Sequence, residues 1–197
     1  LGYRPIFADV DLDSGLITAD SIEPLINKKT KAISVVHLGG WPAEMNSICA
    51  LANKYNLFVV EDCAQAHGAQ IKCNDGFKSV GSFGDVSAWS FCQDKIMTTG
   101  GEGGMVTTNS IKHWEKIWSF KDHGKEFNKV HQEKRNLGFR WLHERFGSNF
   151  RLTEIQSAIG RNQIKKLKNW NVIRNRNAKI LLDELSKCSL LRIPKIP

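Results

Sequence analysis

The first third of the chain alternates short apolar runs with stretches whose apolar residues recur at helical spacing. The runs predict strands, and the recurring positions predict helices, the first of which begins after the N-cap residue Thr18. The expected elements are a strand over Pro5–Val10, a helix with Ile22, Leu25 and Ile26 on one face, a strand over Lys31–His37, a helix over Ala43–Tyr55 and a strand over Leu57–Glu61. This β-α-β-α-β order predicts an α/β fold, with a mostly parallel central sheet covered by helices.

The rest of the chain has a weaker pattern. Small and polar residues over Cys63–Gly84 predict a loop, and the charged, aromatic stretch Asp122–Phe146 predicts a long excursion that we interpret as a functional or mobile loop. The other expected elements are strands over Asp85–Phe91 and Gly104–Thr107, separated by the glycine cluster Gly100–Gly104, a helix over Ile111–Phe120, and a helix over Thr153–Ser186 in one piece or two.

The net charge narrows the choice of partners only slightly. The formal charge of +8 lies largely on the last predicted helix, where a solvated basic face is the simplest interpretation. A basic chain suits an anionic substrate or a nucleic acid, but helix-turn-helix, zinc-finger and RNA-binding signatures are absent, so we expect no nucleic-acid partner. No stretch approaches the ~20 apolar residues of a membrane helix, so we expect no membrane association.

The five cysteines argue against a structural role for sulfur. Their number is odd, and no two have Cys-x-x-Cys spacing. We therefore expect neither a disulfide framework nor a metal site. Reduced thiols are typical of the cytoplasm, which is the expected location.

Two residues follow predicted strands at places where a ligand could bind. Asp62 comes directly after Leu57–Glu61, and ligands of open α/β sheets bind at the carboxyl ends of strands, although aspartate there also starts loops and caps helices. Lys95 follows Asp85–Phe91 and precedes hydroxyl residues and the glycine cluster, which could admit a phosphate or could form a plain turn beside a solvated lysine.

These two residue types suggest one chemistry when they share an edge of a sheet. A lysine amine can form a Schiff base with an aldehyde cofactor. A carboxylate can keep a pyridine nitrogen protonated, so that the ring accepts electrons. The residues alone support this hypothesis only modestly, because no phosphate-loop pattern is present.

Several segments together carry a more specific pattern. They are His37–Met45, Val59–Ala69, Ser82–Asp85, Ser90-Phe91 followed by Lys95, the glycine cluster, Gly147–Leu152 and Glu154–Ala158. In this order they resemble the DegT/DnrJ/EryC1/StrS aminotransferases over nearly the whole chain. These are fold-type-I enzymes that depend on pyridoxal 5'-phosphate (PLP), and most act on nucleotide-linked keto-sugars. The resemblance implies the three-layer α/β/α large domain typical of aspartate aminotransferase.

The resemblance also implies roles for individual residues. Lys95 would form the Schiff base with PLP and then move a proton during the reaction. Asp62 would pair with the pyridine nitrogen, and Gln65 would lie near the ring and its 3-hydroxyl group. Ser90 would donate to the cofactor phosphate. Asn149 would reach the phosphate of a neighbouring subunit, because active sites of the family form at a dimer interface.

Other residues keep two interpretations. His37 is expected to help shape the substrate side, or to be a strand-end histidine with satisfied hydrogen bonds. Gln65 and His67 could pin the loop after the strand, and Asn149 could serve a turn. We expect Arg151 to be a structural ion-pair partner.

The implied reaction transfers an amino group, with glutamate as the expected donor, to a nucleotide-linked keto-sugar in polysaccharide or deoxyaminosugar biosynthesis. Family members are longer, so we expect a homodimeric protein truncated here at both ends. Residues 1–163 would form most of the PLP-binding large domain, and residues 164–197 would begin the small C-terminal domain. The alternatives are an inactive fragment, a regulatory relative or another PLP-dependent sugar-modifying enzyme. The stretch Cys92-Gln93-Asp94 before Lys95 is a subgroup feature without an assigned role.

Overall fold

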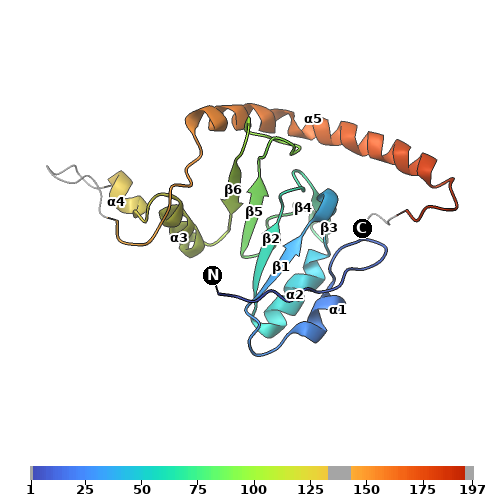
Figure 1. Ribbon diagram of the computed structural model, residues 1–197, viewed down its shortest axis with the longest axis horizontal. Coiled ribbons are helices and arrows are strands. Elements are labelled where there is room, and N and C mark those ends of the chain that lie inside the picture. Colours follow the sequence, from blue (N-terminus) through green and yellow to red (C-terminus); the bar gives the residue numbers. More distant parts are fainter. Residues whose placement is uncertain (1, 133–142, 194–197) are drawn as a thin grey trace.

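A four-stranded sheet organises the part of the chain that the structure, a computed structural model, describes, namely residues 2–132 and 143–193 (Figure 1). The strands lie in the order β1 (Ala32–Val36), β2 (Phe58–Asp62), β5 (Val86–Ser90) and β6 (Gly104–Thr107). β1, β2 and β5 are parallel, and β6 runs antiparallel to β5. The predicted α/β class with a mostly parallel sheet is therefore confirmed.

One face of the sheet is buried by the first helices. These are α1 (Ala19–Ile22), the 3-10 turn η1 (Glu23–Leu25) and α2 (Met45–Tyr55). Alternation of side chains along the strands turns every second residue of β1 and β2 toward them. The main core consists of Leu16, Ile22, Ile33, Val35, Ala43, Met45, Ile48, Leu51, Ala52 and Val59.

The opposite face of the sheet meets α3 (Ile111–Lys121). Phe58 alternates with its buried neighbour Val59, and its ring lies edge-on to that of His113, with the ring centroids 5.2 Å apart. α3 in turn packs through aromatic rings against the short helix α4 (Phe127–Gln132). α3 thus lies against the face opposite α1 and α2 at the start of β2, while the end of β1 on that face stays open, with Val36 43% exposed.

A single long helix, α5 (Glu154–Leu185), crosses the carboxyl ends of the central strands (Figure 1). Thr153 caps it by exchanging hydrogen bonds with Gln156, which is the capping-box pattern. The predicted domain boundary between residues 163 and 164 falls inside this helix and stays a prediction. In the described ranges no helix, α5 included, combines the length and the apolar character that crossing a membrane requires.

Two predictions of local structure are wrong. Pro5–Val10 forms no strand, and Val10 makes an isolated bridge with Ile17 instead. An apolar run becomes a strand only beside a partner strand, and in the described residues this run makes only that single bridge. The predicted loop over Cys63–Gly84 contains a hairpin of β3 (Gln70–Cys73) and β4 (Gly76–Ser79).

The excursion predicted over Asp122–Phe146 is partly helical, because α4 lies within it. The aromatic ring of Phe127 fills the space between Trp114 and Trp118 of α3, and this packing explains a helix that the weak periodicity did not predict. Residues 133–142 of the excursion lie outside the described residues.

Candidate functional site

The carboxyl ends of β2 and β5 bring two predicted site residues to one edge of the sheet. Asp62 ends β2 and Ser90 ends β5. The register pairs Asp62 with Ala88, so Ser90 lies two residues further along the neighbouring strand. Asp62 Oδ1 accepts a hydrogen bond from the Ala64 N–H at 3.0 Å, and Ser90 Oγ accepts one from the Cys92 N–H at 3.3 Å. Both side chains are half-buried, so they remain reachable from this edge.

Lys95 lies in the connection between β5 and the glycine cluster, in a segment that we call the lysine loop (residues 92–99). The loop closes on the Phe91 carbonyl, which accepts hydrogen bonds from the Thr99 N–H at 3.1 Å and from Thr98 Oγ1 at 3.2 Å. The Lys95 side chain is 21% exposed, and its Nζ lies 3.7 Å from the Asp94 carboxylate. It is therefore more covered than the solvated lysine of the alternative interpretation.

The glycine cluster lets the lysine loop pack closely on its surroundings. A Cβ added to Gly103 would lie 2.3 Å from Thr99 Oγ1 and 3.3 Å from the Leu152 side chain. A Cβ on Gly100, whose φ is +79°, would lie 2.8 Å from Ile159 of α5. These glycines are thus needed for packing between the loop and the helix, which a plain turn would not require.

Gln65 joins the loop after β2 to the loop after β1. Its Oε1 accepts a hydrogen bond from the Gly39 N–H at 2.8 Å. The next residue, Gly40, has a φ of +84°, and a Cβ there would lie 2.8 Å from the Gln65 carbonyl oxygen. This contact matches the loop-pinning interpretation of Gln65, while its place near a cofactor ring stays a prediction.

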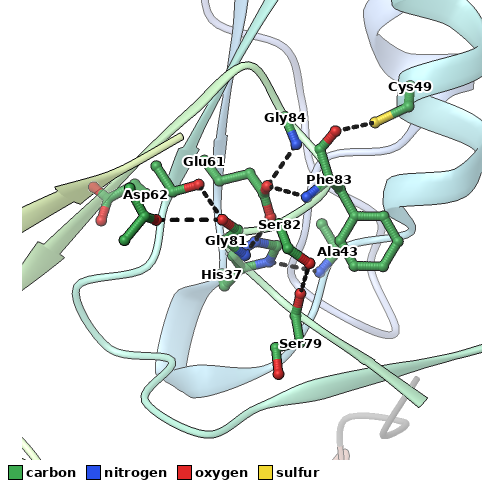
Figure 2. A network of polar contacts seen from close by, with 12 residues as sticks. His37, Ala43, Cys49, Glu61, Asp62, Ser79, Gly81, Ser82, Phe83 and Gly84 are labelled. Carbon is green, nitrogen blue, oxygen red and sulfur yellow. Dashed lines mark hydrogen bonds and ion pairs between the residues drawn. The ribbon is translucent and has the colours of Figure 1, made fainter. Parts of the chain in front are cut away.

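His37 and Glu61 form the centre of a buried hydrogen-bond network (Figure 2). Glu61 Oε1 accepts from the N–H groups of Phe83 at 2.8 Å and Gly84 at 2.6 Å. Oε2 accepts from the Gly81 N–H at 2.7 Å and meets His37 Nε2 at 3.1 Å. Burial raises the pKa of Glu61, but the hydrogen bonds from His37 and the backbone outweigh it and hold the pKa below its usual value.

The second ring nitrogen of His37 settles its tautomer. Nδ1 lies 3.1 Å from the Ala43 N–H, which can only donate, so Nδ1 accepts and the proton sits on Nε2, facing Glu61. Both nitrogens are engaged and the residue is fully buried. Its expected role in shaping the substrate side stays a prediction, and the contacts that the structure gives His37 are structural. His37 ties the start of α2 to β2, which is the alternative of a satisfied strand-end histidine.

Glu61 is the residue that sequence reasoning missed. The carboxylate occupies an inward position of β2, where the alternating pattern calls for an apolar side chain, and that mismatch was a usable signal. Cys63 lies close enough to His37 and Glu61 for the three to resemble a metal-ligand set. Burial and the nearby carboxylates, however, raise the pKa of the Cys63 thiol to about 12, and Glu61 already accepts four hydrogen bonds. These three groups are therefore poorly suited to bind a metal ion.

His67 lies beneath the lysine loop and is 4% exposed. Its ring packs between those of Trp89 and Phe91, with centroid distances of 5.6 and 5.8 Å. Its carbonyl oxygen accepts a hydrogen bond from Asn171 of α5 at 2.9 Å. Burial lowers the pKa of His67, and the positive charge of Lys95 adds to that effect. This uncharged ring therefore pins the loop after β2 to the strand end that carries Ser90.

Asn149 belongs to a second cluster, built by the segment that precedes α5. Its Oδ1 accepts a hydrogen bond from Arg151 Nε at 3.0 Å, and Arg151 Nε lies 3.8 Å from Asp122 Oδ1. Burial raises the pKa of Asp122, but Lys125 and Arg151 outweigh it and lower the pKa. Arg151 thus has the expected ion-pair partner. Among the described residues, Asn149 is held by Arg151 and Lys95 lies beside Asp94, so the two predicted site residues have different neighbours.

A model of the DegT/DnrJ/EryC1/StrS aminotransferase family matches residues 1–197. The chain belongs to this family, whose members depend on PLP. It is 42% identical over 165 residues to a GDP-perosamine synthase of Escherichia coli O157:H7, covering 84% of this chain and 41% of that protein. It is 38% identical over 197 residues to a UDP-N-acetyl-3-dehydro-α-D-glucosamine 3-aminotransferase of Acidithiobacillus ferrooxidans, covering 100% of this chain and 49% of that protein.

Solved structures of the family share this fold. An aminotransferase from Psychrobacter cryohalolentis is 52% identical and superimposes with a TM-score of 0.93, over 98% of this chain and 49% of that one. The chain thus spans about half the length of the relatives that it matches, which agrees with the expected fragment.

Replacing Glu61 with glutamine tests the buried network. An NH₂ group would then face the N–H donors on one side, so we expect Glu61→Gln to lower the free energy of unfolding by about 2–4 kcal/mol. Urea denaturation of the two proteins measures this loss. The exposed Glu115→Gln on α3 is the matched control, and an equally small effect at both positions would contradict the assignment.

The same network predicts how stability depends on pH. Because the folded pKa of Glu61 is lowered, its contribution is complete above the unfolded glutamate pKa of about 4.3 and is lost as pH falls through the folded pKa. We therefore expect the stability gap between wild type and Glu61→Gln to narrow steadily below about pH 4.3. Urea titrations at several pH values measure it, and a gap that widens on acidification would refute the prediction.

Replacing Gly103 with alanine tests the packing of the glycine cluster. The added methyl group would overlap Thr99 Oγ1, and overpacking of this kind costs about 1–3 kcal/mol. We expect Gly103→Ala to lower the thermal midpoint and the second change Thr99→Ala to restore part of the loss. Purely additive effects of the two substitutions would show that the methyl group meets some other obstacle.

Proposed function

We propose that this chain is the cofactor-binding part of a PLP-dependent sugar aminotransferase. The observation that carries the proposal is the position of Asp62, Ser90 and Lys95 around one edge of the sheet, in a chain whose whole length matches the family. Residues 1–163 would belong to the large domain, and residues 164–197 would lead into the small one. The five free thiols favour a cytoplasmic protein.

The donor set at this edge fits PLP in its chemistry. The cofactor needs an amine for its aldehyde, a carboxylate for its pyridine nitrogen and hydrogen-bond donors for its phosphate. Lys95 would supply the amine, Asp62 the carboxylate and the Ser90 hydroxyl one donor. Gln65 lies on the same loop as Asp62 and would reach the ring from that side. No metal is required by this set.

Each residue would have a limited task. When bound, PLP supplies an electron sink for the substrate carbon that exchanges its proton. The Lys95 amine would carry that proton, because it lies in a closed loop and is mostly shielded from water. Asp62 would keep the ring nitrogen protonated and fix the orientation of the ring. His67, Gly103 and α5 would hold these groups in place.

The substrates are inferred from the relatives. Their names point to nucleotide-linked keto-sugars as amino acceptors, and the formal charge of +8 suits an anionic substrate. We infer glutamate as the amino donor and polysaccharide or deoxyaminosugar biosynthesis as the setting. The protein would act as a homodimer, in which the exposed Asn149 reaches the partner's cofactor phosphate. The Arg151 and Asp122 contacts would hold Asn149 ready for that role.

Trapping the adduct tests the role of Lys95. We expect added PLP to give a new absorbance band, and borohydride reduction to leave a covalent adduct that peptide mass spectrometry places on Lys95. Lys95→Ala should lose both signals, because among the described residues Lys95 is the amine in the loop that follows β5 at this edge. The exposed Lys112→Ala on α3 is the matched control and should behave like wild type. Labelling without preference for Lys95 would contradict the proposal.

Asp62→Asn tests the role of the carboxylate. An amide cannot keep the ring nitrogen protonated, so we expect the affinity for PLP to fall by at least tenfold while the thermal midpoint of the cofactor-free chain changes little. Absorbance titration and thermal melting measure the two effects. If instead the melting temperature falls and the affinity stays, the contact of Asp62 with the Ala64 N–H is its main role.

A further inference from the structure

Cys92 connects the groups that would hold the cofactor. Its N–H donates to Ser90 Oγ at 3.3 Å, and its carbonyl oxygen accepts from the Lys95 N–H at 3.1 Å. Its Sγ lies 3.3 Å from Glu102 Oε1, on the far side of the lysine loop. One residue thus touches the candidate phosphate donor, the candidate lysine and the glycine cluster.

The main chain of Glu102 is held in place, while its exposed side chain supplies the acceptor for that thiol. Its carbonyl oxygen accepts a hydrogen bond from Gln156 Nε2, which comes from the first turn of α5. Gln156 is itself fixed by the capping box with Thr153. The next residue, Gly103, is packed too tightly on Thr99 to carry a Cβ. The backbone around Glu102 is therefore anchored to α5 on one side and to the lysine loop on the other.

The Cys92 thiol is suited to act as the donor. The backbone N–H of Asp94 favours the thiolate, but the hydrogen bond to Glu102, partial burial and the Asp94 carboxylate outweigh it and raise the pKa of Cys92. The thiol therefore keeps its proton at neutral pH, and the S–H points to a carboxylate that can only accept. The charged side chains of the segment near the thiol are Asp94, Lys95 and Glu102.

We propose that Cys92 and Glu102 are positioning residues for Lys95. The hydrogen bond from the Cys92 thiol to the Glu102 carboxylate, which we call the clasp, holds the lysine loop against α5. The inference rests on the proposed function for the role of Lys95. Neither residue needs to touch the cofactor. The Phe91 carbonyl closes the loop at its base through Thr98 and Thr99, and the clasp restrains the other end, where Cys92 precedes the lysine. This gives the stretch Cys92-Gln93-Asp94 a role that its sequence did not reveal.

The first test measures the thiol in the cofactor-free chain. The rate of iodoacetamide alkylation at Cys92, followed by peptide mass spectrometry across pH, reports the thiol pKa. We expect Glu102→Gln to lower that pKa, because it removes the neighbouring negative charge. Cys188, exposed after α5, is the internal control and should not change. An unchanged Cys92 pKa would overturn the clasp.

The second test measures the accessibility of Lys95, also without PLP. Reductive methylation with formaldehyde and cyanoborohydride labels Lys95 and, as a reference, Lys112. We expect Cys92→Ala to speed labelling of Lys95 relative to Lys112 by about threefold to tenfold, the equivalent of one hydrogen bond. Glu102→Ala should do the same, and the double variant should go no further than either single change.

Cys92→Ser is the conservative rescue. A hydroxyl group still donates to Glu102, so this variant should label at the wild-type rate, and labelling as fast as in Cys92→Ala would refute a hydrogen-bonding role. With PLP present, Cys92→Ala should also weaken cofactor affinity by about threefold to tenfold. If no protein forms an adduct at Lys95, the proposed function falls, whereas the two cofactor-free measurements still decide the clasp.

Discussion

The rest of the structure depends on one carboxylate in a place where the sheet would otherwise be apolar. Glu61 extends inward from β2. It accepts hydrogen bonds from the N–H groups of Gly81, Phe83 and Gly84, in the loop that precedes β5, and from the ring of His37, which follows β1. An isolated buried charge would be very costly, so the loops must bring their N–H groups to it. The same contacts fix how β1, β2 and β5 stand relative to one another. Asp62 follows Glu61 at the end of β2, so the same contacts also fix its position.

Around this rigid centre, the candidate site is built mostly from main-chain contacts. The lysine loop closes on a single carbonyl group of Phe91, and the glycine cluster allows α5 to approach it closely. Side chains then adjust the details: His67 supports the strand end from below, and Cys92 reaches Glu102 across the loop. This arrangement places the Lys95 amine on a loop whose backbone is held by hydrogen bonds, which suits a group that must meet a reacting carbon repeatedly in one orientation.

The sequence predicted the elements whose signals are local. Short apolar runs located β1, β2 and β5, and the N-cap residue Thr18 marked the start of α1. Pro5–Val10 was misjudged because strand formation depends on a neighbour as well as on composition. The burial of His37 was beyond local reasoning, since its partner Glu61 is 24 residues away and meets it only through the parallel register. The places of Asp62 and Lys95 after neighbouring strands could be predicted because the carboxyl ends of parallel strands share an edge, while their roles stay predictions that rest on the resemblance to a family.

The long helix α5 has a practical consequence. None of its residues is buried, and apolar side chains along it stand open, Ile155 being 77% and Val172 64% exposed. In water, apolar surface of this extent favours contact with any other apolar surface, including that of a second molecule. We therefore expect the tendency of the 197-residue chain to self-associate to rise with protein concentration and with kosmotropic salts, which strengthen such contacts. Dilute solutions, with light scattering to monitor particle size, are the conditions in which its chemistry can be separated from its self-association.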